Sequence, residues 1–149
     1  VYKRQQLGEV GEVVSCKTAV LEALLEKQMT PVVSSIGCFK NNFSTCNINA
    51  DLAASALAKE LSPEKVIFTS DTFGIWDEKQ KTIENLNLNQ IGELKDKGII
   101  SGGMWVKTQA FEEFLRENPS SKLELIRGLN AEDLDNYRAG NASFTRVSR

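Results

Sequence analysis

Apolar residues in this chain recur alternately at helical and at strand spacing. Between positions 20 and 25 they fall at i, i+1, i+4 and i+5, which predicts an amphipathic helix over residues 18–27. A run rich in β-branched residues predicts a buried strand over residues 31–37. A short strand is expected at residues 12–14. The polar residues 38–46 predict a loop or a small hairpin.

The same alternation continues to the end of the chain. The pattern predicts strands at residues 65–69, 122–126 and 144–147. It predicts helices at residues Ala50–Leu61, 89–97, 104–117 and Ala131–Arg138. Asn49 and Asn130 stand at the expected N-caps of two of these helices, and Gly98 at the C′ position of a third. Such alternation predicts an α/β fold, here a mainly parallel sheet with helices on both faces, an αβα sandwich.

Composition and charge narrow the class of protein. The chain has 149 residues, about one domain's worth. Its net charge is −2, so the sequence lacks the basic footprint of a nucleic-acid-binding protein. No apolar run approaches the ~20 residues of a membrane span, and no secretory signal is recognisable. These features predict a cytoplasmic globular protein with neither nucleic-acid nor membrane partners.

The first residues and the cysteines set two further expectations. Residues 1–5 look like a translated adapter end, so we expect natural sequence to begin near Gln6 and residues 6–149 to form one lobe. The three cysteines lack C-x-x-C spacing and the chain has no histidine. We therefore expect reduced thiols and no metal held directly by protein side chains.

Residues 70–76 form the first of three segments suited to bind a ligand. They follow the predicted strand 65–69, and open α/β sheets bind ligands at the carboxyl ends of their strands. Asp71 could accept a hydrogen bond from a ribose hydroxyl or an adenine amino group, and Gly74 permits a tight turn close to a ligand. A flat base could lie against Phe73, Ile75 and Trp76. An ordinary loop with a capping aspartate explains the same residues taken singly.

A glycine pair, Gly102-Gly103, opens the predicted helix 104–117. Free amides and the helix dipole at such a position favour an anion such as a nucleotide phosphate. Lys107 lies one turn further along the helix and could reach the same anion. A solvated surface lysine is the alternative explanation. The pair is neither a Walker A loop nor a complete G-x-G-x-x-G motif.

The third segment, Asn47-Ile48-Asn49-Ala50-Asp51, precedes an alanine-rich helix. The Asn47 amide could donate to a substrate carboxylate, and Asp51 could hold lysine ammonium groups in position. Simple N-capping by Asn49 and Asp51 explains those two residues but leaves Asn47 without a role. Together the three segments supply polar amides, a carboxylate, glycine turns and a lysine, as a phosphoryl-transfer site needs.

These segments resemble the C-terminal half of the acetylglutamate kinases, in the amino-acid kinase family with its carbamate kinase-like fold, from about Leu7 onward. The resemblance implies that the family's N-terminal lobe, with its glycine-rich loop and second catalytic lysine, is missing. It implies that Asn47 binds acetylglutamate, that Asp51 organises the catalytic lysines, and that Lys107 stabilises the transferring phosphoryl group. The implied ATP-site residues are Asp71, Thr72, Phe73, Gly74, Ile75, Trp76, Ile99, Ile100, Ser101, Gly103 and Met104.

The resemblance also implies a reaction. ATP would phosphorylate the side-chain carboxylate of N-acetylglutamate in arginine biosynthesis, with Mg²⁺ held mainly through the ATP phosphates. The full-length enzyme would be a homo-oligomer. The family's C-terminal Gly-Thr is replaced here by Ala-Ser-Phe-Thr at residues 142–145. Alternatives are an aminoadipate-type, uridylate or carbamate kinase, and a non-catalytic regulatory protein of the same fold.

Overall fold

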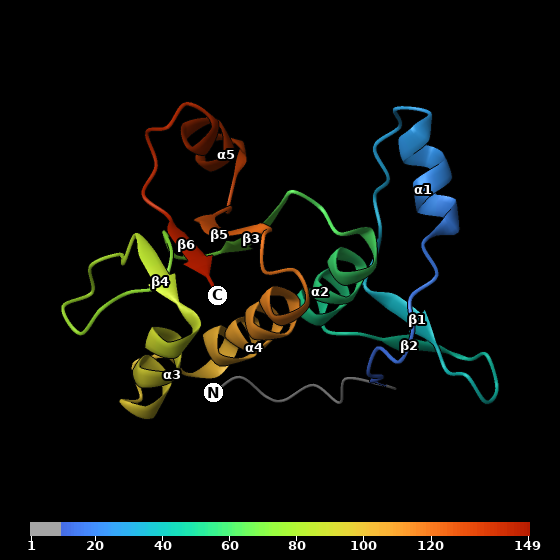
Figure 1. The fold of residues 1–149 in the computed structure, drawn as a ribbon, viewed down its shortest axis with the longest axis horizontal. Helices are drawn as coiled ribbons and strands as arrows, with labels where there is room; N and C mark the ends of the chain where they lie inside the picture. The colour runs from blue at the N-terminus through green and yellow to red at the C-terminus, as the bar shows by residue number, and fades with distance from the viewer. Residues whose placement is uncertain (1–9) are drawn as a thin grey trace. The chain divides into compact units, whose positions relative to one another are not determined.

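The computed structural model describes residues 10–149, so the expected adapter sequence at residues 1–5 and the motif residues near Leu7 lie outside the described part. The chain divides into two compact units, of which the first ends at Leu61 and the second extends from Ser62 to Arg149 (Figure 1). Each unit is described by itself below.

The first unit contains helix α1 (Ala19–Glu26), strands β1 (Ile36–Cys38) and β2 (Thr45–Asn47), and helix α2 (Ala50–Leu61). The two strands pair antiparallel, with Gly37 opposite Cys46, so the expected small hairpin is confirmed. Both predicted helices are also confirmed. Asn49 caps α2 because its side-chain oxygen accepts the backbone N–H of Asp51 at 2.9 Å.

Two predictions for the first unit are wrong. Residues 31–35 form no strand and Val32 is 96% exposed, because β1 pairs with β2 only over residues 36–38. A strand needs a neighbour to satisfy its backbone, and β-branched composition alone does not supply one. Residues 12–14 are not a strand either; only Val10 forms a bridge, to Asn47. The apolar stripe of α1 buries none of its side chains.

The second unit is built on one four-stranded sheet. Its elements are β3 (Lys65–Ser70), β4 (Asn85–Asn87), α3 (Leu88–Asp96), α4 (Gly102–Glu117), β5 (Lys122–Arg127), α5 (Ala131–Arg138) and β6 (Thr145–Ser148). The strand order is β3-β5-β6-β4. The pairs β3·β5 and β4·β6 are parallel, whereas β5·β6 is antiparallel. The prediction of a mainly parallel sheet is confirmed, although β4 was not foreseen and α4 begins two residues earlier than expected.

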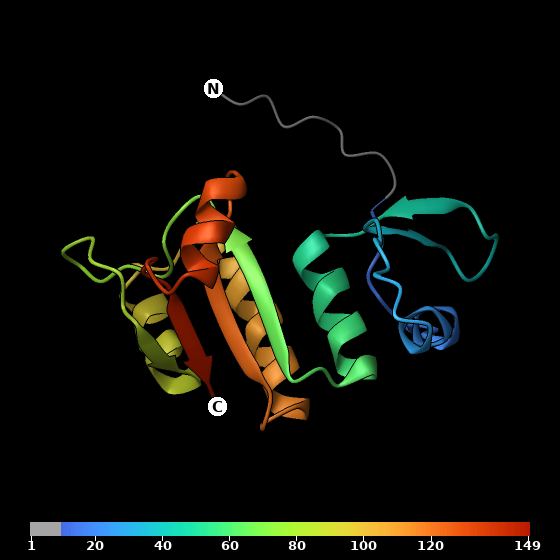
Figure 2. The ribbon, with the colours of Figure 1, turned by 90° about the horizontal axis from the view of Figure 1, so that it is seen from above.

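Helices cover both faces of this sheet, as predicted. On one face Phe68 of β3 meets Phe111 of α4, with ring centroids 4.8 Å apart, and Phe111 is fully buried. Figure 2 shows α4 running behind β3 and β5. On the other face Tyr137 of α5 donates a hydrogen bond to Glu124 of β5. The core of the unit therefore lies between the sheet and α4, and α5 closes the opposite face with a polar contact.

Capping chemistry explains where several helices begin and end. Asn87 and Gln90 form a reciprocal capping box at the start of α3, and Asn130 caps α5 by accepting the Asp133 N–H at 3.0 Å. At the end of α3, Gly98 has φ +71°, as expected for a C′ glycine. Helix α4 differs, because the side chain of its N-cap residue Ser101 makes no capping hydrogen bond.

Candidate functional site

The predicted nucleotide segments gather at one edge of the second unit's sheet. Residues 70–76 leave the carboxyl end of β3, and β5 ends beside it because the two strands are parallel. Helix α4 is joined to the amino end of β5 by a short connection and runs back along the sheet, so its N-terminus lies at the same edge (Figure 2). This is the edge at which open α/β sheets bind ligands.

The turn after β3 exposes some of its predicted ligand residues and buries others. Asp71 is exposed, and Thr72 Oγ1 donates to the Gly74 carbonyl at 2.8 Å. Phe73 and Trp76 are partly exposed, at 38% and 39%. Ile75 is only 2% exposed, so its side chain belongs to the core and does not face a ligand. The exposed members of this turn are therefore the ones able to contact a nucleotide.

The start of α4 presents backbone amides to solvent. Ser101, Gly102 and Gly103 are exposed, and no side chain of Ser101 covers the first-turn N–H groups. Glycine at these positions leaves room for an anion to approach. Ile99 and Met104 are half-buried on either side, whereas Ile100 is 2% exposed and part of the core.

Lys107 lies one turn into α4 and is half-buried. Its ammonium nitrogen is 5.7 Å from the centroid of the Phe68 ring, which is itself buried in β3. The lysine therefore extends along the sheet side of α4 near the end of β3. Such a partly desolvated cation acts more strongly on nearby negative charge than a fully hydrated one.

An open pocket of about 540 Å³ lies at the same edge. Phe73 lines it, and the Arg127 guanidinium lies 4.7 Å from the Phe73 ring centroid. Polar residues from α5 and from residues 141–143 complete the wall. Phe73 is the only one of the predicted site residues in this lining. The sequence analysis did not identify Arg127, whose position at the end of β5 was the available signal.

Asn47 and Asp51 belong to the first unit. Asn47 is the last residue of β2 and its side chain is exposed, while its backbone carbonyl accepts the Gly11 N–H at 2.9 Å. Asp51 is half-buried in the first turn of α2. The cap of α2 comes from Asn49, so the Asn47 amide is not needed to begin that helix.

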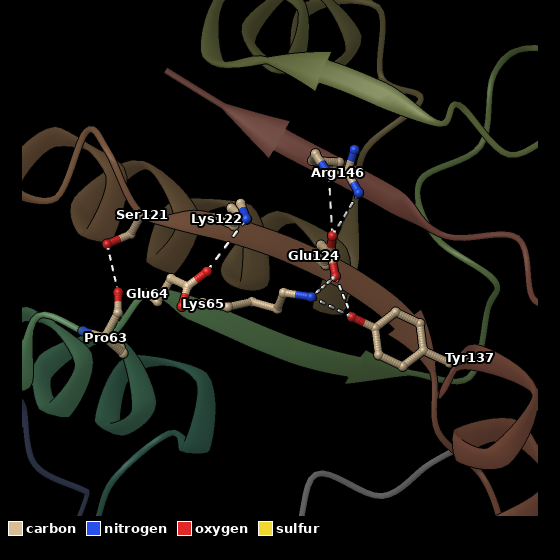
Figure 3. Close-up of polar contacts among 8 residues, drawn as sticks. All are labelled: Pro63, Glu64, Lys65, Ser121, Lys122, Glu124, Tyr137 and Arg146. Carbon is tan, nitrogen blue, oxygen red and sulfur yellow. Dashed lines mark hydrogen bonds and ion pairs between the residues drawn. The ribbon is translucent and has the colours of Figure 1, made fainter. Parts of the chain in front are cut away.

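A charged cluster on the α5 face of the sheet was missed by the sequence analysis (Figure 3). The side chain of Glu124 is 2% exposed and accepts from Arg146 Nη2 at 2.9 Å, from Lys65 Nζ at 3.2 Å and from the Tyr137 hydroxyl. One buried carboxylate thus ties β3, β6 and α5 to β5. Its neighbours in the Lys-Leu-Glu-Leu run alternate as in a half-exposed strand, so the sequence indicates a solvent-facing glutamate.

The cluster changes the proton affinity of its members. Burial by itself raises the pKa of Glu124, but hydrogen bonds from Tyr137, Arg146 and Lys65 outweigh it and hold that pKa below its ordinary value. Burial, together with the hydrogen bond to Glu124, raises the pKa of Tyr137. Hydrogen bonds to Tyr137 and Glu124 raise the pKa of Lys65. At neutral pH the cluster therefore keeps a carboxylate, a phenol, an ammonium and a guanidinium.

Two further observations on residues 10–149 concern metal binding and membrane insertion. In that part of the chain no three His, Cys, Asp or Glu side chains are grouped to hold a metal ion. None of its helices combines the length and apolar character needed to cross a bilayer. The three cysteines are free thiols, and Cys46 is the buried one.

Known proteins share both sequence and fold with this chain. Residues 2–123 match the sequence model of the amino acid kinase family. Acetylglutamate kinase from Methanococcus aeolicus is 42% identical over 125 residues, covering 82% of this chain and 42% of that enzyme. Acetylglutamate kinase from Campylobacter fetus is 41% identical over 109 residues, covering 73% and 39%. The chain thus spans about two fifths of the length of these relatives.

A solved structure agrees at the level of the fold. Carbamate kinase from Giardia lamblia superposes with a TM-score of 0.69 at 22% identity, over 87% of this chain and 42% of that one. The sequence match, which covers most of the residues, decides the assignment. The chain belongs to the amino acid kinase family.

Proposed function

We propose that the chain is the nucleotide-binding part of an acetylglutamate kinase, which transfers a phosphoryl group from ATP to the side-chain carboxylate of N-acetylglutamate. The observation that carries this proposal is the uncapped, glycine-rich start of α4 beside the turn that follows β3. The identity of about 40% to acetylglutamate kinases supports the substrate. The reaction would belong to arginine biosynthesis.

The composition of the site suits this reaction. The acceptor is a carboxylate that is ionised at neutral pH, so the transfer needs no general base and a chain without histidine can serve it. Catalysis then rests on positioning and on stabilising charge in a loose phosphoryl transition state. Lys107 is the proposed stabilising cation, and the amides of Gly103 and Met104 would bind phosphate oxygens.

The remaining roles follow from the family. Asn47 would donate its side-chain amide to acetylglutamate, and Asp51 would organise the catalytic lysines. Mg²⁺ would supply charge neutralisation and would be held mainly through the nucleotide phosphates. Asp71, Phe73 and Trp76 are the exposed side chains of the turn available to the nucleoside.

We expect the isolated chain to bind ADP·Mg weakly, with a dissociation constant on the order of 1 mM, and to have no kinase activity. The nucleotide segments lie within one unit, whereas the chain spans about two fifths of its relatives. Calorimetric titration with ADP and Mg²⁺ measures the binding, and coupled ADP release measures turnover. Absence of any saturable heat contradicts the nucleotide site, and robust turnover contradicts the second expectation.

A second expectation separates Asn47 from Asp51 in the full-length enzyme that contains this chain. Asn47→Ala should raise the KM for acetylglutamate about tenfold or more and leave nucleotide affinity nearly unchanged, because it removes a hydrogen bond to a charged group. Asp51→Asn should lower kcat while the protein still folds, since the amide keeps the shape of the first turn of α2.

Steady-state kinetics and thermal melting on both variants test this pair. Asn49→Ala is the matched control, because it removes the α2 cap without touching the proposed substrate contact. It should lower the melting temperature and leave both KM values unchanged. If Asp51→Asn unfolds the protein and Asn47→Ala has no kinetic effect, the motif is structural and these roles are wrong.

A further inference from the structure

We propose that Thr145 is a positioning residue for the nucleotide-binding turn, the segment of residues 72–76 that follows β3. Thr145 is the first residue of β6 and lies about 70 residues away in sequence. The inference rests on the proposed function for its ligand, because it assumes that the turn contacts a nucleotide. It concerns a tail residue to which the sequence analysis assigned no role.

The Thr145 hydroxyl accepts one hydrogen bond from, and donates one to, the loop that begins with this turn. The residue is fully buried. Its oxygen accepts the backbone N–H of Ile75 at 2.8 Å and donates to the carbonyl of Ile83 at 2.7 Å. Ile83 in turn donates its N–H to the Ile75 carbonyl at 2.8 Å. One hydroxyl therefore links Ile75, near the start of the loop, to Ile83, near its end.

Gly74 is the residue of the turn that packs against Thr145. It has φ +133°, a conformation that side-chain-bearing residues rarely adopt, and it is buried. A Cβ atom at this position would collide with Thr145 Oγ1 and lie 2.9 Å from the Thr145 backbone nitrogen. The backbone of the turn thus lies directly against Thr145. The bond from Thr72 Oγ1 to the Gly74 carbonyl closes the turn from within.

This arrangement determines how the turn presents its exposed groups. The exposed residues Asp71 and Phe73 directly precede the fixed Gly74–Ile75 backbone, while Ile75 anchors it in the core. A loop held in its binding conformation loses less entropy when a ligand binds, so its affinity is higher than that of a mobile loop. Thr145 would act on the nucleotide only through the backbone of Ile75.

The test compares Thr145→Val with Thr145→Ser. Valine fills the same volume but removes the hydroxyl, whereas serine keeps it. In the valine variant we expect the amide of Ile75 to exchange with solvent at least about tenfold faster and ADP·Mg affinity to fall by about five- to tenfold. The serine variant should stay near the wild type in both measurements. Thr145→Cys serves as the second variant if the valine protein does not fold, because a thiol is a poor acceptor.

Ser121→Ala is the matched control for loss of a hydroxyl. The Ser121 hydroxyl donates to the Pro63 carbonyl at 2.8 Å, at the amino end of β5, opposite the site (Figure 3). This variant should lower the melting temperature but leave Ile75 exchange and ADP affinity unchanged. A role of Thr145 in core stability alone would make Thr145→Val behave in the same way as this control.

Each outcome decides the inference. Wild-type exchange at Ile75 in the valine variant overturns it, and so does faster exchange with unchanged ADP affinity. If the wild-type chain binds no ADP at all, the proposed function fails and the ligand part of this inference fails with it. The exchange measurement then still decides whether Thr145 fixes the turn.

Discussion

In the full-length kinase that we propose, we expect replacement of Lys107 by alanine to lower kcat by about 10²–10³-fold and to leave the KM for ATP within a few-fold of the wild type. The ammonium is expected to matter most where negative charge develops on the transferring phosphoryl oxygens. Its stem is half-buried along the sheet side of α4, which restricts the positions that the charge can take. Initial rates at saturating acetylglutamate, measured over a range of ATP concentrations, give both constants.

Lys97→Ala is the matched control for this prediction. Lys97 caps the end of α3, is well exposed and forms a 3.7 Å ion pair with the exposed Glu78. Its removal should change neither constant, because an exposed pair of this kind contributes little. A Lys107→Ala enzyme with near-normal kcat and a large rise in the KM for ATP would assign the lysine to ground-state binding instead.

Glu124→Gln in the described chain reduces the free energy of unfolding at pH 7 by about 2 kcal/mol. The glutamine keeps the volume but removes the charge to which Lys65, Tyr137 and Arg146 donate. Removing one partner of a fully buried ion pair reduces the free energy of unfolding by more than this. Here the Lys65 and Arg146 side chains are 40% and 51% exposed, so water compensates part of the loss. Urea denaturation of both proteins measures the difference.

The pH dependence of that difference follows from the lowered pKa of Glu124. A carboxyl with a depressed folded-state pKa contributes stability above its unfolded pKa, and the contribution is lost as the pH falls through the folded value. The gap between wild type and Glu124→Gln should therefore shrink as the pH falls below about 4. Glu64→Gln, which breaks an exposed ion pair with Lys122 at the amino ends of β3 and β5, should change stability little. A gap that does not vary with pH contradicts the charge-based explanation.

Local patterns predicted most of the elements in the second unit. Helix α5 and its Asn130 cap, the Gly98 terminator and the strands β3 and β5 depend on signals a few residues long, which the sequence carries directly. The wrong predictions concern which strands pair with one another. Residues 31–35 have strand composition but belong to no strand among the described residues 10–61. Strand β4 has three residues, two of them asparagines, and forms by pairing with β6. Pairing over long sequence separations leaves little local trace.

In the candidate site, too, the sequence indicated the residues that carry a local signal and not those whose role depends on distant segments. The exposed residues Asp71 and Gly103 and the half-buried Lys107 were indicated by their positions at or near strand and helix ends. The burial of Ile75 and Ile100 was not, because apolar residues in a loop fit a ligand wall and a core equally well. Glu124 and Thr145 were missed because their roles depend on α5 and on the loop after β3, which the chain brings to them from elsewhere.

Strand β3 is one of the two edge strands of the second unit's sheet, and it is longer than the other, β4. Its outer side pairs with no strand in the part of the chain that the structure describes, and Ile67 is 43% exposed. The six residues contain no proline and a single charge, at Lys65. The unpaired backbone groups of such an edge strand can form hydrogen bonds with a strand of another chain. An unpaired edge strand of this length and composition therefore makes the chain prone to aggregate through strand pairing between molecules.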